Sequence, residues 1–278
     1  MQSVLLGCNI VSPPTERKAM DVKYWNDFAD EYDELVTDAF SYGRLHTIAT
    51  TIENYASPEL DAADYGCGPG KILPLLSQKL RHVYAYDFSN KLLDIARRRC
   101  EKLKNVEIAQ ADLSKPVDNL PVVDLIVTLN AIIMPDTKLR LQFMQGVASR
   151  IKPGGHLIMN VPSVESLLYS AFRETEWYRK EQGHTPKKAE FQTDISSLTG
   201  PRMLAQGIMY RGTEPTKHYL REELVVLVRD EMKLDLIDIV KMEYDWATDF
   251  EDDNIPNWMG EPYPWDWLVI AKAKQQTL

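Results

Sequence analysis

Between residues 61 and 162, short apolar runs alternate with segments of helical periodicity. The predicted strands are the apolar runs 62–65, 82–86, 106–110, 123–129 and 156–161. The predicted helices, with apolar residues three and four positions apart, are 71–80, 89–102 and 137–151. Repeated strand-helix units of this kind predict an α/β fold, a parallel sheet with helices on both faces.

From residue 163 to 218 this alternation stops over a length that exceeds an ordinary connection. The stretch is rich in large side chains, namely Tyr169, Phe172, Trp177, Tyr178, Phe191, Met203, Met209 and Tyr210. We interpret it as a cap inserted between the fifth and sixth strands and covering a substrate. A helix at 221–232 then resumes the core. The extended segments 234–246 and 265–274 follow with no helix between them, so the last strand is expected to be antiparallel.

Ahead of the core, the pattern predicts a helix over 22–36 that docks through one apolar face. That face carries Trp25, Phe28, Ala29 and Tyr32. The domain prediction is therefore a flexible N-terminus at 1–20, a core made of 21–162 and 219–278, and a cap at 163–218.

Composition narrows the class of protein. The 278 residues, 44% of them hydrophobic, suit one large core, and no apolar run has the roughly 18 to 20 residues of a membrane span. Cys8, Cys67 and Cys100 form no CxxC pair, which favours a reducing cytoplasm and no zinc site. A net charge of −9 disfavours nucleic acid and favours a small-molecule substrate. Monomer and homodimer both stay open.

The strongest local signal is the run Asp64-Tyr-Gly-Cys-Gly-Pro-Gly70, which leads from the first predicted strand into a helix. Gly66, Gly68 and Gly70 permit positive φ angles and let bare backbone approach a ligand. The dinucleotide fingerprint needs its third glycine at position 71, which is Lys71, so NAD and FAD are disfavoured. A tight turn that binds no ligand is the alternative.

Two acids follow at the ends of the next strands. Asp87 closes the second strand, where a carboxylate can accept hydrogen bonds from both ribose hydroxyls of a nucleoside; it can also cap the helix that starts near Ser89. Asp112 and Leu113 follow the third strand and suit an adenine ring. As an alternative, Asp112 is an ordinary turn residue before Pro116.

These residues, in this order, resemble the class I S-adenosylmethionine (SAM)-dependent methyltransferases, and more narrowly the branch related to ubiquinone and menaquinone biosynthesis. The turn Ile151-Lys-Pro-Gly-Gly155 and the helix motif Tyr24-Trp-Asn26…Tyr32-Asp33 are similar to that family as well. The resemblance implies a Rossmann-like, seven-stranded, mostly parallel sheet with an antiparallel last strand, which agrees with the pattern above. Departures are Ala62-Ala63 before the acid, and Leu220 where relatives have a helix-capping Ser or Thr.

Carried over to this chain, the resemblance implies SAM as the cofactor. Asp64 would contact the amino group of the methionine portion, Gly66 and Gly68 would line it with backbone, and Asn130 would face the sulfonium. The predicted cofactor-binding set is Trp25, Tyr32, Asp64, Gly66, Cys67, Gly68, Gly70, Asp87, Phe88, Asp112, Leu113 and Asn130.

Methyl transfer from a sulfonium is an in-line displacement, so alignment and exclusion of water are the protein's main tasks and no metal is required. If the acceptor needs a general base, His184 and His218 are the candidates, because both lie in the predicted cap. The predicted function is transfer to an oxygen or nitrogen atom of a small molecule. The alternatives are a tRNA or rRNA methyltransferase, and a SAM-binding protein without catalysis.

Overall fold

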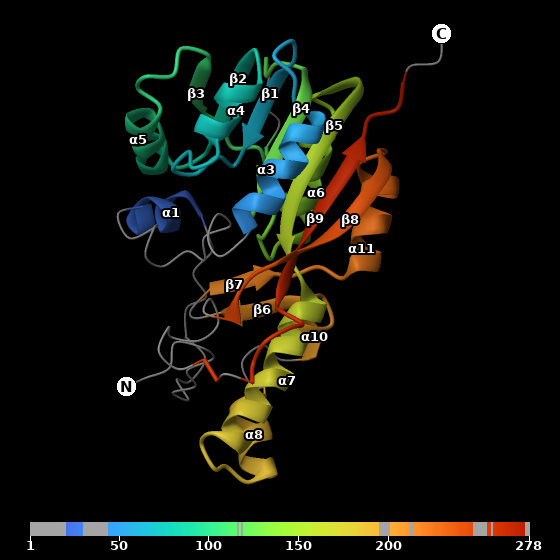
Figure 1. Ribbon diagram of the computed structural model, residues 1–278. Helices are drawn as coiled ribbons and strands as arrows, with labels where there is room; N and C mark the ends of the chain where they lie inside the picture. The colour runs from blue at the N-terminus through green and yellow to red at the C-terminus, as the bar shows by residue number, and fades with distance from the viewer. Residues whose placement is uncertain are drawn as a thin grey trace.

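The computed structural model describes residues 21–29, 44–115, 117, 119–194, 201–211, 214–246, 255–256 and 258–275. Its centre is a seven-stranded sheet with the strand order β3-β2-β1-β4-β5-β9-β8 (Figure 1). The strands are β1 (Asp61–Tyr65), β2 (His82–Asp87), β3 (Val106–Gln110), β4 (Val123–Leu129), β5 (Ile151–Pro162), β8 (Asp235–Glu243) and β9 (Trp265–Lys272).

The direction of the strands confirms the predicted fold class. Strands β3, β2, β1, β4 and β5 pair in parallel, whereas β9 is antiparallel to both β5 and β8. Helices connect β1 to β2, β2 to β3 and β4 to β5, and such helical crossovers suit parallel strands.

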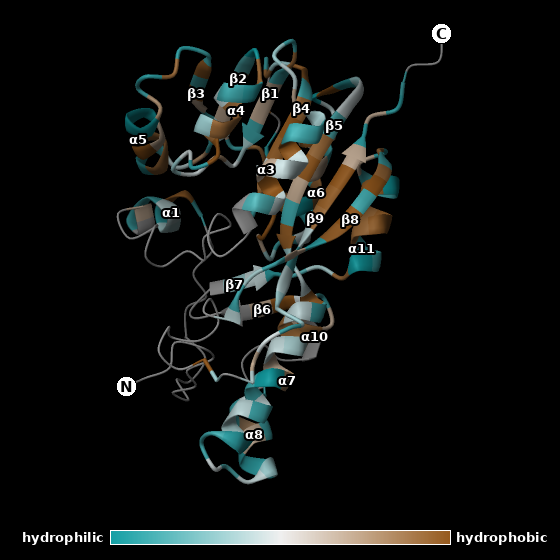
Figure 2. Cartoon of the chain, viewed as in Figure 1, coloured by the Kyte–Doolittle hydropathy of each residue, from teal (hydrophilic) through white to brown (hydrophobic). Residues whose placement is uncertain are grey.

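Helices cover both faces of the sheet, and the strands are apolar where the helices pack on them (Figure 2). One face packs against α3 (Arg44–Tyr55), α4 (Leu73–Lys79) and α5 (Asn90–Arg99). The other packs against α6 (Thr137–Ala148), α11 (Arg221–Val226) and the π-helical turn η2 (Leu227–Glu231). The sheet therefore has a buried core on each side, and its functional residues are left to the ends of the strands.

Several helices begin or end at residues other than the predicted ones. Helix α4 starts at Leu73 and not at 71, because Gly70 has φ +75° and Pro74 occupies the first turn. Helix α5 starts after Ser89, whose side chain accepts a hydrogen bond from the Leu92 backbone at 3.3 Å. Leu220 has no capping oxygen, but Glu223 accepts its backbone N–H at 3.4 Å, so α11 still begins there.

The N-terminal helix α1 (Val22–Phe28) is shorter than the predicted 22–36 as far as the structure describes it. It lies beside α5 (Figure 1). The predicted flexible segment 1–20 and the rest of the predicted helix, from residue 30, lie outside the described residues.

Between β5 and α11 the chain forms a separate group of elements. They are α7 (Val164–Lys180), α8 (Pro186–Gln192), α10 (Pro201–Leu204) and the hairpin of β6 (Ile208–Arg211) and β7 (Glu214–Lys217). The chain leaves and re-enters the core at one point, where the Tyr219 N–H donates to Pro162 O at 2.8 Å and the Val164 N–H to Tyr219 O at 3.1 Å. Helices α7 and α8 extend beyond the carboxyl end of the sheet (Figure 1). Among the described helices, none has the length and apolar character to cross a membrane.

Candidate active site

The glycine loop after β1 is bent back onto the end of β2. The backbone N–H groups of Gly66 and Cys67 both donate to the Tyr86 carbonyl, at 2.8 and 3.0 Å. Gly66 has φ +80°, and a Cβ atom there would lie 2.3 Å from the Cβ of Ala131. Only glycine satisfies both conditions. The loop is therefore packed directly against the segment that follows β4.

Asp87 fixes the same loop from the end of β2. Its side chain is 6% exposed, and its two oxygens accept hydrogen bonds from the Gly68 and Ser89 backbone N–H groups at 3.0 and 2.8 Å. Burial raises the pKa of Asp87, and the backbone hydrogen bonds from Ser89, Gly68 and Phe88 oppose that rise. Because a carboxylate accepts about four hydrogen bonds in all, Asp87 retains capacity for ligand hydroxyls.

Asp64, at the end of β1, is the most unusual charged group of the site. Its side chain is 2% exposed, and Oδ2 has no hydrogen-bond partner in the described part of the chain. Burial, with a smaller contribution from the negative charge of Asp87, raises the pKa of Asp64 to about 8. A buried carboxyl group without a partner is unfavourable unless a ligand supplies one. A ligand amine would do so.

Asn130 follows β4 and turns the chain, with φ +53°. Its backbone N–H donates to Asn160 O at 3.0 Å, while its side-chain Oδ1 is buried without a partner among the described residues. Since its neighbour Ala131 contacts Gly66, Asn130 lies at the same end of the sheet as the glycine loop.

The segment after Asn130 is held from the other side by the chain returning from residues 163–218. Tyr219 Oη donates to the Ile132 carbonyl at 2.7 Å, and the Lys217 backbone N–H to the Ile133 carbonyl at 2.8 Å. Arg140 donates to the carbonyls of Met134 and Pro135 at 2.8 and 2.6 Å. Four consecutive carbonyls are thus fixed, which makes this wall of the site rigid.

The residues predicted to contact adenine have their own internal partners. The Asp112 carboxylate accepts hydrogen bonds from the Ser114 backbone and hydroxyl at 3.1 and 2.6 Å, and it lies 2.6 Å from Lys115 Nζ. Burial alone would raise the pKa of Asp112, but the bonds from Lys115 and Ser114 outweigh it and lower the pKa. Asp112 thus closes a turn, which was its alternative interpretation. Leu113 is buried in the core.

Two of the remaining predicted cofactor residues, Cys67 and Phe88, follow β1 and β2. Phe88 is half-buried and its carbonyl accepts a hydrogen bond from Gln110 at 2.9 Å. Cys67 is buried, and burial raises the pKa of its thiol, so it is a neutral packing residue. Trp25 is half-buried on α1. Tyr32 lies outside the described residues.

Helix α1 is attached to this end of β2 through Asn26. The Asn26 Oδ1 atom accepts hydrogen bonds from the Ser89 hydroxyl at 2.7 Å and from the Lys91 backbone at 3.4 Å. Because Ser89 N also binds Asp87, α1 is connected by two steps to the carboxylate predicted to bind ribose.

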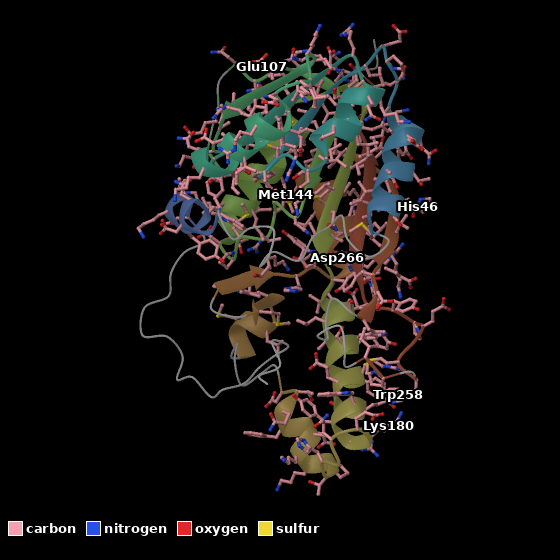
Figure 3. The ribbon with its side chains drawn as sticks, turned by 60° about the vertical axis from the view of Figure 1, so that its left-hand side comes forward. His46, Glu107, Met144, Lys180, Trp258 and Asp266 are labelled. Carbon is pink, nitrogen blue, oxygen red and sulfur yellow. The ribbon has the colours of Figure 1, made fainter. Side chains whose placement is uncertain are left out.

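The two candidate histidines occupy different places. His218 is 5% exposed and lies between Lys217 and Tyr219, with Nδ1 3.2 Å from the Thr216 carbonyl. His184 follows α7, with its ring stacked on Tyr178 at a centroid distance of 5.2 Å. Figure 3 shows Lys180, at the end of α7, far from the sheet. The structure therefore brings His218 near the segment after β4 and leaves His184 away from the glycine loop.

One polar residue that sequence reasoning missed lies within β5. Asn160 is fully buried, and neither Nδ2 nor Oδ1 has a hydrogen-bond partner among the described residues. It is the only polar residue in the run Leu157-Ile-Met-Asn-Val161, and this isolated polar position was the available signal. The described residues contain no group of three His, Cys, Asp or Glu side chains that could hold a metal ion.

Comparison with known proteins agrees with this geometry. Residues 62–155 match the family model of a methyltransferase domain. A Streptomyces fradiae protein, the uncharacterized 37.1 kDa protein in transposon TN4556, is 31% identical over 157 residues. That alignment covers 49% of this chain and 42% of the relative, so the chain spans less than half of the relative's length.

Solved structures share the fold over most of their length. A SAM-dependent methyltransferase from Methanosarcina mazei has a TM-score of 0.57 at 18% identity, over 81% of this chain and 98% of its own. A SAM-dependent methyltransferase from Anabaena variabilis has a TM-score of 0.58 at 12% identity, and the match covers 95% of this chain and 99% of that one. The N-methyltransferase NodS of Bradyrhizobium japonicum, in complex with S-adenosylhomocysteine (SAH), has a TM-score of 0.55 at 11% identity. That match covers 91% of this chain and 97% of NodS.

The chain therefore carries a methyltransferase domain in the Rossmann-like fold that solved SAM-dependent methyltransferases share. The prediction of the fold is confirmed, and the match of residues 62–155 supports the predicted enzyme class, of which SAM is the cofactor.

Proposed function

We propose that this chain transfers a methyl group from SAM to an oxygen or nitrogen atom of a small-molecule acceptor, without a metal ion. The observation that carries the proposal is Asp64, a buried carboxyl group with an unpartnered oxygen beside a loop of three positive-φ glycines. SAM combines a cationic ammonium group, a sulfonium and a nucleoside, and this combination suits a buried acid, bare backbone and a second acid at the end of β2.

Each group of the cofactor has a counterpart in the chain. Asp64 would bind the ammonium group, the backbone at Gly66 and Gly68 would line the methionine portion, and Asp87 would accept from the ribose hydroxyls. Asn130 would face the sulfonium end. For the adenine, Leu113 is the better supported contact, since the carboxylate of Asp112 is already engaged with Lys115.

Bound SAM supplies a methyl group on a sulfonium, which the acceptor atom takes up as the carbon–sulfur bond breaks, leaving SAH and a proton released from the acceptor. The residues of the chain position the reactants and exclude water. The rigid wall made by Tyr219, Lys217 and Arg140 suits that task because it fixes the segment next to Asn130. His218 stays the candidate base, since it adjoins this wall.

Residues 163–218 are proposed as the cap over the acceptor. They leave and rejoin the core beside Pro162, at the carboxyl end of the sheet where open α/β folds bind ligands. The net charge of −9 supports a small molecule over a polynucleotide. The narrower resemblance to ubiquinone and menaquinone methyltransferases, the cytoplasmic location and the choice between monomer and homodimer stay predictions from the sequence.

The test combines binding with turnover. Isothermal titration should show SAM and SAH binding to the wild-type chain, and Asp87→Ala should abolish it while circular dichroism shows a folded protein. Asp94→Asn is the matched control, because Asp94 is an exposed acid on α5 paired with Arg97. A metabolite panel assayed for SAH release then identifies the acceptor. Unchanged SAM affinity in Asp87→Ala would contradict the cofactor assignment, and salt-dependent retention on bulk tRNA would favour an RNA substrate.

A further inference from the structure

Asn160 is a fully buried amide that makes no hydrogen bond through its side chain in the described structure. An asparagine side chain offers two donors and an acceptor, and leaving such a group unpaired in the interior is unfavourable. A leucine would fill this position in β5 without that cost, as Leu129 and Leu268 do at the paired positions on β4 and β9. The amide therefore needs an explanation other than packing.

The position of Asn160 places it at the functional end of the sheet. Its carbonyl accepts from Asn130 N at 3.0 Å, so it lies level with the residue predicted to face the sulfonium. Along β5 it shares a face with Ile158, which packs in the same cluster as Ile48 of α3. It is therefore buried between the sheet and α3, one strand from Asn130 and two strands from Asp64.

A carboxylate lies on the same face at this end. Asp266 is the second residue of β9 and pairs with Pro162, two residues along β5 from Asn160. Figure 3 shows Asp266 at the end of the sheet near the β6–β7 hairpin. Positions related in this diagonal way are about 7 to 8 Å apart and within reach of one small ligand group. The carboxylate of Asp266 disfavours an anionic ligand group next to Asn160.

We propose that Asn160 is an acceptor-binding residue that hydrogen-bonds a neutral group of the methyl acceptor, an amide or a hydroxyl. An amide or a hydroxyl both donates and accepts, so it satisfies Nδ2 and Oδ1 together. Its place beside Asn130 puts that group next to the position of the transferred methyl. This assignment rests on the proposed methyltransferase function and adds the chemical class of the acceptor to it.

The experiment uses the full chain labelled with ¹⁵N-asparagine, saturated with SAH and titrated with acetamide as a neutral amide probe. The side-chain NH₂ signals of Asn160 are assigned by their loss in Asn160→Leu. Asn105 is the internal control, because its amide already donates to Ser77 O and Leu80 O and accepts from the Ser77 hydroxyl. We expect a saturable millimolar shift at Asn160, no shift at Asn105, and a weaker response to acetate.

Absence of a saturable shift at Asn160 overturns the proposal. A water molecule that stays bound to the Asn160 amide in the presence of acetamide or ethanol overturns it as well. If SAH does not bind, the proposed cofactor fails, and the same titration of the ligand-free chain still tests Asn160 by itself.

Turnover gives the second readout. On the best acceptor found in the metabolite panel, Asn160→Leu should lose at least about tenfold in kcat/KM while its SAM dissociation constant stays within about twofold. Its melting temperature should equal or exceed that of the wild type, since an unpaired amide is removed. Asn160→Ala replaces it if the leucine variant does not fold. Wild-type kcat/KM in the folded variant rejects the proposal.

Discussion

The raised pKa of Asp64 makes the stability of the ligand-free chain depend on pH in a specific direction. In the folded chain the carboxyl group titrates at about 8, against an ordinary value of 3.8. Between these values the folded state keeps a proton that the unfolded state has lost. The free energy of unfolding therefore falls as pH rises from about 4 to about 8 and levels off above that. The difference of about four pKa units corresponds to about 5 kcal/mol.

Asp64→Asn removes this dependence while keeping the shape of the side chain. At about pH 3 Asp64 is protonated in both the folded and the unfolded wild type, so the free energies of unfolding of wild type and variant should be similar there. At about pH 9 the variant should be more stable than the wild type, by at least about 1 kcal/mol and at most about 5 kcal/mol. Urea unfolding followed by circular dichroism at several pH values measures this difference in the free energy of unfolding. A wild-type curve parallel to that of Asp64→Asn would refute the reasoning.

The same titration predicts proton release on binding of SAM. The ammonium group of the ligand needs the ionised carboxylate of Asp64, so binding below pH 8 should displace a proton from the protein. Affinity should rise with pH by up to about tenfold per unit until the ligand amine itself loses its proton near pH 8. Isothermal titration in buffers of different ionisation enthalpy measures the released proton. Equal proton release by Asp64→Asn would assign it to another group.

Three further changes test the walls of the site. Gly66→Ala should destabilise the chain by about 1–3 kcal/mol in urea unfolding, and adding Ala131→Gly should recover only the part due to the clash, because the positive φ persists. Tyr219→Phe leaves the Ile132 carbonyl unpaired, so SAM affinity in calorimetry should fall and stability should fall by about 1–3 kcal/mol. The control is Tyr169→Phe, which removes a hydrogen bond to Pro262 O and should affect stability alone. Asp87→Asn should weaken SAM binding at least about tenfold, and it should lower stability by about 1–3 kcal/mol because the amide NH₂ cannot accept one of the two backbone hydrogen bonds.

The sheet could be predicted because each of its strands and covering helices is defined by a pattern within a short run of residues. The parallel strands are short and largely apolar, and helices with regular apolar spacing follow β1, β2 and β4, which indicates both the direction and the layer of these elements. The sequence predicts no helix between segments 234–246 and 265–274, so the last strand is expected to be antiparallel, and β9 confirms this. Helix starts were less predictable, because the start of α4 depends on the φ angle of Gly70 and on its packing against Ala96.

The site was predictable where it depends on backbone and unpredictable where it depends on competing side chains. Gly66, Gly68 and Asp87 are held together by hydrogen bonds that follow from the strand-loop-helix pattern. The engagement of Asp112 with Lys115 depends on a local turn. The position of His184 beyond the end of α7 depends on the length of that helix, which the aromatic pattern of residues 163–218 did not reveal.

The polar residues of three neighbouring strands show why function belongs to one end of this sheet. At their amino ends, polar groups are paired: Arg81 binds Asp61 of β1 at 2.8 Å, and Lys152 of β5 binds Asp124 of β4 at 2.8 Å. Pairing with Arg81 lowers the pKa of Asp61, so this charge stabilises the fold.

At or just beyond the carboxyl ends of the same strands lie Asp64, Asn130 and Asn160, each with a buried polar atom that has no partner in the described structure. A sequence selected for stability alone would have paired or removed these groups, as happens at the amino ends of the same strands, about 10 to 26 Å away along them. Their unmet hydrogen bonds lie along one line, from the glycine loop through the turn after β4 to β5. In the proposed function, the cofactor and then the acceptor would be bound along that line.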